Sequence, residues 1–189
     1  HYKDQMIKES SWLHEHPEEG WCEFETTYFI VKRIEELGLK ALCGIEVIEP
    51  TAVMGRNEET VQAAQARAQE HGVPAEFLKR LGGYTGAMAV LETGRPGPVT
   101  AIRVDIDCLP IEETNDPKHE ANQGHYRSIY TGFSHACGHD GHTAVGLGVV
   151  AWLADNKEHL NGTVKVLFQP AEEGVRGAAA MAAKGIVDD

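Results

Sequence analysis

The segment FSHACGHDGHTA, residues 133–144, places four side chains that can bind a metal ion within eight positions: His135, Cys137, His139 and His142. Thiolate and imidazole are ligands that divalent transition metals accept. Residues two apart in an extended loop point the same way, so Cys137 and His139 can reach one ion. The alternative is a polar loop with solvent-facing histidines, in which Asp140 caps the following helix. So many candidate ligands in one short segment favour the metal site.

Two adjacent carboxylates lie in a second segment, FQPAEEG, residues 168–174, which follows a predicted strand. In open α/β sheets, functional sites gather at the carboxyl ends of strands. At such a place one of Glu172 and Glu173 can bind metal while the other transfers protons. Taken alone, a pair of glutamates is more often a solvated part of a loop.

A third segment, RVDIDCLPIEE, residues 103–113, carries Asp105 and Asp107 at the end of another predicted strand. The two-residue period of a strand puts both side chains on one face. An aspartate there can orient a ligand imidazole or contact a metal, although turn formation explains it equally well. Because all three segments flank strands of one predicted sheet, together they indicate a hydrolytic metal site.

The remaining histidines and cysteines are interpreted as structural. His14 and His16 come just before Pro17, which favours a loop over metal ligation. Cys108, within the third segment, is expected to be a small core residue, and Cys22 and Cys43, far from the motifs, are expected to be structural. Without a secretion signal or paired cysteine spacing, we expect reduced thiols and a cytoplasmic protein.

The composition is that of an ordinary globular protein, with 42% hydrophobic and 24% charged residues among 189. The formal net charge of −12 argues against a nucleic-acid partner, which requires clustered Lys and Arg. No apolar run approaches the roughly 20 residues needed to span a bilayer. Disorder, nucleic-acid binding and membrane insertion are therefore not expected.

Periodicity predicts helices that alternate with strands, which is typical of a layered α/β domain. The predicted helices cover residues 3–14, 23–37, 57–70, 75–81, 142–154 and 177–183. The predicted strands cover residues 87–93, 99–106 and 163–169, with 99–106 expected to be buried. The polar helices within 51–83 are interpreted as an insertion that contributes little to the core.

The segments RVDIDCLPIEE, SHACGHDGHTA and FQPAEEGVRGAAAM, in this order, resemble the M20 metallopeptidase superfamily. The similarity is to its amidohydrolase branch, which includes hippurate and indole-acetyl-amino-acid hydrolases. HPEEGWCEFETT, ETGRPGPV, the helical region 51–83 and the final GIVDD extend the resemblance over nearly the whole chain. The resemblance implies a three-layer α/β/α zinc-peptidase-like catalytic domain with a mixed sheet. Residues 1–189 would be its N-terminal portion, truncated and without the inserted lid and dimerisation domain.

The resemblance also implies roles for individual residues. Cys137, His139 and Glu173 would be ligands of two divalent ions, with manganese expected and zinc as the alternative. Glu172 would be the general base and then the acid that protonates the leaving amine. Asp105 matches the strand-end aspartate beside the metals. Two later histidine ligands of the family would lie beyond this chain.

The implied activity is hydrolysis of the amide bond of an N-acyl amino acid. The expected substrate is p-aminobenzoyl-glutamate, from folate breakdown, and another N-acyl amino acid such as hippurate is the alternative. Because three ligands cannot satisfy two ions, the chain alone is expected to be inactive, with half a metal site. The longer protein is expected to be a homodimer or to form a complex with a second related subunit. A purely structural zinc module would not need Glu172 beside Glu173.

Overall fold

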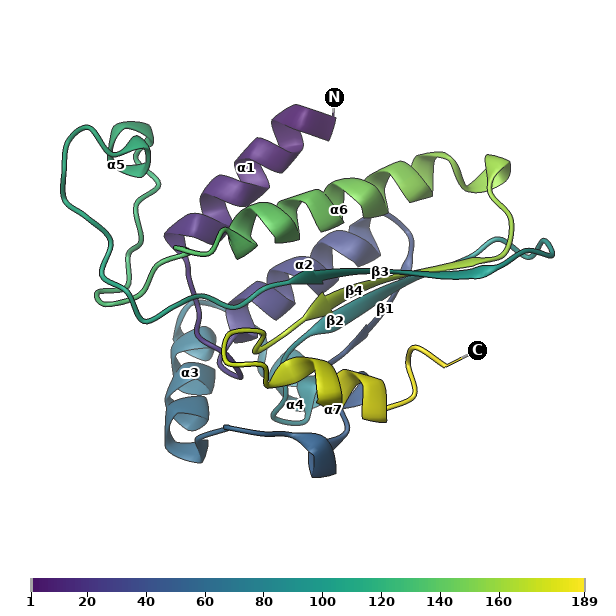
Figure 1. Cartoon of the computed structure of the whole chain (residues 1–189), viewed down its shortest axis with the longest axis horizontal. Coiled ribbons are helices and arrows are strands. Elements are labelled where there is room, and N and C mark those ends of the chain that lie inside the picture. Colours follow the sequence, from purple (N-terminus) through teal and green to yellow (C-terminus); the bar gives the residue numbers. More distant parts are fainter. Residues whose placement is uncertain (1, 189) are drawn as a thin grey trace.

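A mixed sheet of four strands forms the centre of the molecule in the computed structural model, which describes residues 2–188 (Figure 1). Asp189, the last residue of the GIVDD segment, and His1 lie outside the described residues. The α-helices are α1 (Tyr2–Glu15), α2 (Phe24–Glu36), α3 (Glu58–Glu70), α4 (Ala75–Leu81), α5 (Glu120–Gly124), α6 (His139–Asp155) and α7 (Gly177–Ala183). The strands are β1 (Lys40–Cys43), β2 (Ala87–Glu92), β3 (Val99–Asp105) and β4 (Thr163–Gln169). The short 3₁₀ helices are η1 (Gly44–Glu46), η2 (Pro50–Ala52) and η3 (Lys157–His159).

The order of the strands in the sheet is β1-β2-β4-β3. β2 runs antiparallel to both β1 and β4, whereas β3 and β4 are parallel and are joined through α6. In the register of that parallel pair, Asp105 at the end of β3 lies beside Gln169 at the end of β4. The residues that follow both strands therefore emerge at the same edge of the sheet.

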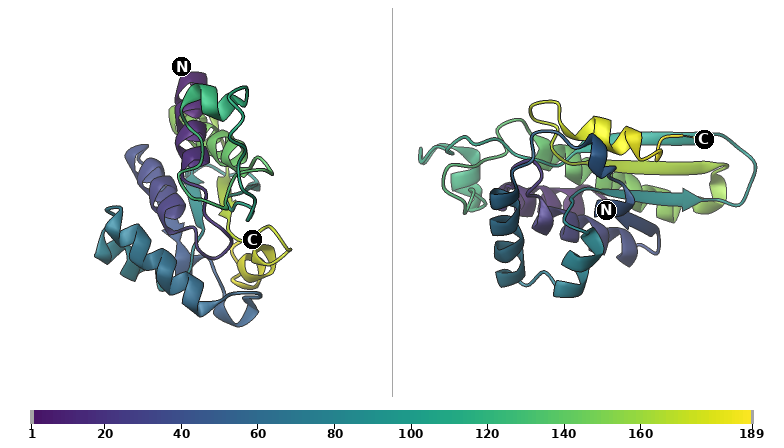
Figure 2. Two further views of the ribbon diagram at one scale, coloured as in Figure 1. Left: turned by 90° about the vertical axis from the view of Figure 1, so that its left-hand side faces the viewer. Right: turned by 90° about the horizontal axis from the view of Figure 1, so that it is seen from below.

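Helices cover both faces of the sheet, which confirms the predicted three-layer α/β/α arrangement. α2 and α6 pack directly on one face, with α1 against α6, and α7 packs on the other face (Figure 1). Figure 2 gives two further views, and the strands run side by side in the one seen from below. The interior between these layers is apolar and fully buried, and includes Phe24, Ile30, Ile34, Leu147 and Phe168.

Helix α6 approaches the sheet closely because it presents glycine to it. A Cβ atom at Gly146 would lie 2.9 Å from side-chain carbons of both Phe168 and Val104. The helix also begins three residues earlier than the predicted start at His142. Its N-cap is Gly138 rather than Asp140, whose carboxylate contacts His14 instead. The alternative interpretation, in which Asp140 caps the helix, therefore does not hold.

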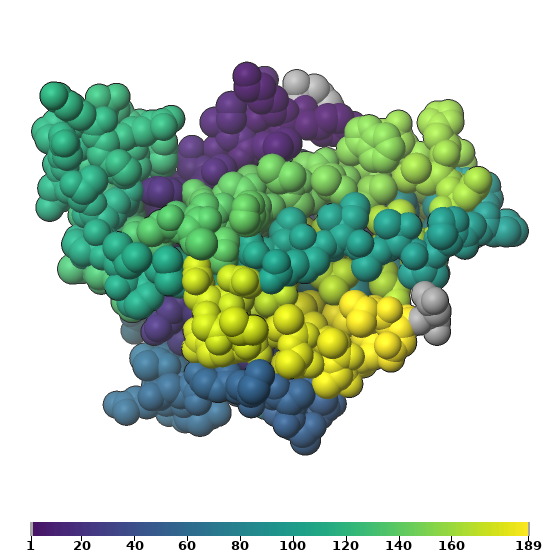
Figure 3. Space-filling view, in the orientation of Figure 1, coloured from purple at the N-terminus to yellow at the C-terminus, as the bar shows by residue number. Residues whose placement is uncertain are grey.

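Strand β3 is not the buried strand that its apolar sequence predicted. It lies at the edge of the sheet, and most of its residues are exposed or half-buried, with Val99 46% exposed. Figure 3 shows residues of β3, in teal, on the surface between green α6 and yellow α7. Only its last residue, Asp105, is buried. β-Branched content predicted a strand here, but it does not reveal whether a second neighbour covers that strand.

The region 51–83 contains the two predicted helices, α3 and α4, but contributes more to the core than expected. Five apolar residues from this region belong to the buried cluster: Val61, Ala64, Ala68, Val73 and Leu81. The buried stripe of α3 consists of small residues on an otherwise polar helix. For that reason the polar composition of the segment did not indicate that one side of α3 packs into the core.

The chain between β3 and α6 forms a long excursion at one end of the molecule, where α5 is its regular element (Figure 1). No helix or strand was predicted over 107–136, and α5 is a helix of five residues within that range. No helix within residues 2–188 has the length and apolarity needed to cross a membrane.

Candidate metal centre

The predicted site residues gather at the edge of the sheet where β3 and β4 both end. β3 ends at Asp105, the turn after β4 carries Glu172 and Glu173, and the loop before α6 carries Cys137. The Thr143 hydroxyl, in the first turns of α6, donates to the backbone carbonyl of Asp105 at 3.0 Å. This bond fastens the start of α6 to the end of β3.

Cys137, His139 and Glu173 come together as a set of three. One potential ligand atom from each lies within 4.8 Å of the other two. His139 Nε2 is 3.9 Å from Glu173 Oε1. Donors around a tetrahedral ion at about 2.1 Å from each are separated by roughly 3.4 Å. The separations in this set are therefore close to those around a shared cation.

The backbone of Asp107 orients the His139 ring. His139 Nδ1 lies 2.9 Å from the Asp107 carbonyl oxygen, which can only accept, so the proton is on Nδ1. Nε2 is then the nitrogen that faces the carboxylates of Asp105, Glu172 and Glu173, at 3.5, 3.8 and 3.9 Å. A histidine fixed through Nδ1 with a free Nε2 is the usual arrangement of a metal ligand whose ring is oriented by its surroundings.

The same carboxylates make the site strongly acidic. Burial lowers the pKa of His139, but Asp107 and Asp105 outweigh this and raise it to about 9. A hydrogen bond to Glu173 raises the pKa of the Cys137 thiol above its ordinary value. Without a metal, His139 and the Cys137 thiol therefore hold protons more tightly than usual. A divalent cation would displace these protons on binding.

Two side chains beside the cluster, His142 and Arg103, contact the carboxylate of Asp105. Its Oδ1 lies 2.6 Å from His142 Nδ1, and its Oδ2 lies 3.0 Å from the guanidinium of Arg103. Arg103 also donates to Gln169 and lies 3.8 Å from Glu172. Asp105 therefore links strand β3 to α6 and to the charge around Glu172.

Two buried carboxylates, those of Glu23 and Asp107, hold the turn that carries Glu172 and Glu173. Glu23, which is 0% exposed, accepts from the Ala171 N–H at 2.8 Å and from the Thr85 hydroxyl at 2.6 Å. Ala171 has a φ of +49°, a conformation that side chains rarely adopt. Asp107 accepts from the Glu173 N–H at 2.9 Å. Burial, followed by repulsion from Asp107, raises the pKa of Glu23 to about 8.

Two buried oxygens in this site have no hydrogen-bond partner within residues 2–188: Asp107 Oδ1 and Glu173 Oε1. Asp107 Oδ1 is 3.3 Å from His139 Nδ1, but that proton already goes to the Asp107 carbonyl. A buried acceptor without a partner is costly, and a cation held by Cys137, His139 and Glu173 would satisfy Glu173 Oε1. Together with the Cys137 sulfur and His139 Nε2, this oxygen shows that the residues fit a divalent metal.

Sequence reasoning missed several groups that build the site. Glu23 was not singled out because its partner Ala171 follows it by 148 positions, and Arg103 was not singled out although it begins the third segment. His135, one of the candidate ligands, is buried apart from that three-residue set. Neither of its ring nitrogens has a hydrogen-bond partner among the residues that the structure describes, and burial lowers its pKa to about 4. His14 lies within α1 rather than in a loop, and it contacts Asp140.

This fold, with carboxylates at the strand ends beside a cysteine and a histidine, has relatives among known proteins. Residues 101–189 match the family model described as Peptidase family M20/M25/M40. The wider chain is similar to several known proteins.

One curated relative, from Haemophilus influenzae, is an A-subunit homolog of p-aminobenzoyl-glutamate hydrolase, 46% identical over 98% of this chain and 44% of its own length. A solved structure of an aminobenzoyl-glutamate utilization protein from Klebsiella pneumoniae has a TM-score of 0.79 and 39% identity, and covers 99% of this chain and 41% of its own. A Bacillus subtilis structure described as a dinuclear metal binding peptidase from the M20 family has a TM-score of 0.71 and 32% identity, over 99% and 40% of the two chains. The chain thus spans less than half the length of these relatives.

Proposed function

We propose that this chain supplies the first part of a metal-dependent catalytic domain that hydrolyses the amide bond of N-acyl amino acids. The observation that carries the proposal is the convergence of Cys137, His139 and Glu173, with Glu172 beside them at the carboxyl ends of β3 and β4. A closed structural site would need no further carboxylate, whereas a hydrolase needs one to move protons.

Cys137, His139 and Glu173 would hold the metal. We propose two divalent ions, with manganese preferred because carboxylates dominate the site and zinc as the alternative because a thiolate is present. When bound, such ions would polarise the amide carbonyl and acidify the attacking water. Asp107 keeps His139 Nε2 available, and Asp105 anchors the neighbouring edge of the site.

Glu172 would transfer the protons. Its side chain is 35% exposed, so it can reach substrate and solvent, and its Oε2 lies 3.8 Å from His139 Nε2. It would accept a proton from water as the water oxygen bonds to the amide carbon. It would then deliver that proton to the leaving nitrogen as the C–N bond breaks. The products are a carboxylic acid and an amine.

The substrate we propose is p-aminobenzoyl-glutamate, which would yield p-aminobenzoate and glutamate in folate catabolism. Support comes from the names of the Haemophilus and Klebsiella relatives, both of which refer to aminobenzoyl-glutamate. A hippurate-like N-acyl amino acid is the rival substrate for the same chemistry.

We further propose that residues 1–189 are the N-terminal portion of this catalytic domain, with 51–83 as a helical insertion. The longer protein would be cytoplasmic, and would act as a homodimer or with a second related subunit. The name of the Haemophilus relative, which describes one subunit of a hydrolase, supports the second arrangement. This chain alone would have no turnover, since it offers three strong ligands for two ions.

The test is Glu172→Gln in the longer protein that contains this chain, assayed with p-aminobenzoyl-glutamate and with hippurate. We expect kcat to fall by about 10²–10⁴-fold with metal content unchanged. Glu76→Gln, the same change at an exposed position on α4, is the matched control and should leave kcat intact. Near-normal turnover by Glu172→Gln would refute the assignment. A higher kcat/KM for hippurate than for p-aminobenzoyl-glutamate would support the proposed reaction but assign it to a hippurate-like substrate.

A further inference from the structure

A second cluster of metal-capable side chains lies outside the centre described above. It consists of His14 at the end of α1, Glu113 in the loop after β3, and His119 just before α5, and one donor atom of each lies within 4.8 Å of the others. His14 Nε2 and His119 Nε2 both lie 2.8 Å from the same oxygen, Glu113 Oε1. Three elements far apart in sequence thus direct two imidazoles and one carboxylate at one point.

The surroundings of this cluster are those of a supported ligand set. The other nitrogen of His14, Nδ1, lies 2.8 Å from Asp140 Oδ2, and a carboxylate at that position orients a ligand imidazole. The other oxygen of Glu113 accepts from the Ser128 N–H at 2.7 Å. Only Oε1 of the carboxylate and the Nε2 atoms of the histidines face the common point.

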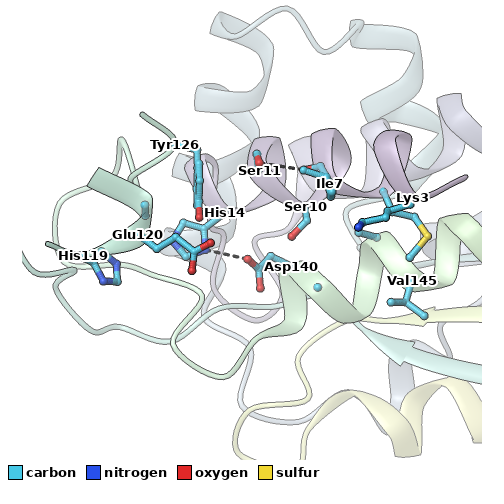
Figure 4. Close-up of a pocket in the computed structure, with 14 residues that line it drawn as sticks. Lys3, Ile7, Ser10, Ser11, His14, His119, Glu120, Tyr126, Asp140 and Val145 are labelled. Atoms are coloured by element: carbon cyan, nitrogen blue, oxygen red, sulfur yellow. Dashed lines mark hydrogen bonds and ion pairs between the residues drawn. The ribbon is translucent and has the colours of Figure 1, made fainter. Parts of the chain in front are cut away.

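An open path leads to the cluster. A cleft of about 530 Å³ lies between α1, the start of α6 and the α5 segment, and His14, His119 and Asp140 line it (Figure 4). The close-up shows His14 and Asp140 joined across the cleft, with Tyr126 beside the His14 ring (Figure 4). His119 is 36% exposed on its side chain, so solvent reaches the donors from the cleft.

We propose that His14, Glu113 and His119 form a second metal site that takes one zinc-type divalent ion. Two imidazoles and a carboxylate are a set that zinc accepts as three protein ligands, with a fourth position left for water on the cleft side. The present 2.8 Å separations are those of hydrogen bonds. To hold zinc at about 2.1 Å, the donors must part to roughly 3.4 Å, a shift of about half an ångström that a carboxylate rotation supplies. The ion would fasten the loop after β3 to α1 and, through Asp140, to the start of α6.

The experiment uses the full chain with the first centre disabled by Cys137→Ser and Glu173→Gln, titrated with zinc and analysed for bound metal. We expect one ion per chain to remain. Adding His119→Ala should weaken its binding by at least tenfold, and Asp140→Asn by about 10–100-fold. His159→Ala, at an exposed histidine in η3, is the matched control and should change nothing. Circular dichroism of each variant establishes that it is folded.

Cobalt provides an independent readout. The first centre should give a thiolate-to-cobalt charge-transfer band, whereas the second site should give only the weaker d–d bands of nitrogen and oxygen ligation. Retention of d–d bands in the disabled chain, and their loss with His119→Ala, is the expected result. No bound ion in the disabled chain, or an ion indifferent to His119→Ala, would overturn the proposal and leave a hydrogen-bonded network. Neither result depends on hydrolytic activity.

Discussion

At the scale of single residues, the two strand-end aspartates have different tasks. The two-residue period placed both on one face, and Asp105 was expected to be the one beside the metals. Asp107 is the more buried, and it fixes His139 through its carbonyl and Glu173 through its carboxylate. Asp105 lies 3.5 Å from His139 Nε2 at the same centre, and it is also tied to Arg103 and His142. Spacing alone could not separate these roles, since both depend on where α6 begins.

Glu23 allows a stability prediction at this scale. Glu23→Ala would leave the buried Ala171 N–H and the Thr85 hydroxyl without an acceptor, which costs roughly 2–4 kcal/mol of unfolding free energy. Glu23→Gln should stay within about 1 kcal/mol of wild type, because an amide oxygen still accepts from Ala171. Urea denaturation measures both. Equal stability of the alanine and glutamine variants would show that the carboxyl group does not hold this turn.

At the scale of helices and strands, most elements could be predicted because their periodicity is local. Residues 75–81, 163–169 and 177–183 are α4, β4 and α7 with the predicted bounds. β1 was not predicted, because four residues of mixed character give too short a pattern. The exposure of β3 was also missed, since edge position depends on strand order and not on the strand's own residues.

The close approach of α6 to the sheet leads to a second prediction. Gly146→Val places carbon where Phe168 and Val104 already lie, and should lower the unfolding free energy by about 1–3 kcal/mol or more. It should also weaken metal binding, because α6 carries His139. Gly141→Ala, in the same helix with no atom near its added Cβ, is the control and should be neutral or stabilising by up to about 1 kcal/mol. Thermal unfolding and metal titration distinguish the two variants. Equal behaviour would contradict the packing argument.

Helix α3 is fastened to the rest of the chain by charge. Arg67 reaches the buried Glu18 at 2.7 Å and Glu25 at 3.1 Å. Burial raises the pKa of Glu18 from 4.5 to about 7, against the attraction of Arg67. Because the pKa of the folded state is the higher one, the stabilising contribution of Glu18 is complete below about pH 4.5 and is lost as the pH rises through about 7.

Glu18→Gln tests this linkage, since glutamine mimics the protonated carboxyl at every pH. Between about pH 5 and pH 8, wild type should lose up to about 3 kcal/mol of unfolding free energy relative to Glu18→Gln. Urea denaturation across that range gives the difference, and Glu76→Gln, at an exposed position, should show no such trend. Parallel curves for wild type and Glu18→Gln would show that Glu18 does not titrate differently on folding.

At the scale of the whole molecule, the formal net charge is −12, and three of the carboxylates, Asp105, Glu172 and Glu173, lie where β3 and β4 end. Bound divalent ions would neutralise that charge only in the folded chain. At free manganese or zinc about 100-fold above Kd, the unfolding free energy should rise by about 2.7 kcal/mol. A chelator should reverse the rise, and Cys137→Ser should reduce it at equal metal concentration. An identical rise in wild type and Cys137→Ser, measured by thermal unfolding, would place the ion elsewhere.

The position of β4 has a consequence for biosynthesis. Among the strands within residues 2–188, β4 comes last in sequence, yet it lies between β2 and β3. During synthesis on the ribosome, the edges of β2 and β3 that pair with β4 therefore remain unpaired until residue 169 has emerged. Unpaired strand edges can pair with other chains. Cys137 and His139 are translated before Glu173, so the ligands meet only after the central strand is inserted. Cys137, His139 and Glu173 would thus be ready to hold a metal only after β4 has paired with its neighbours.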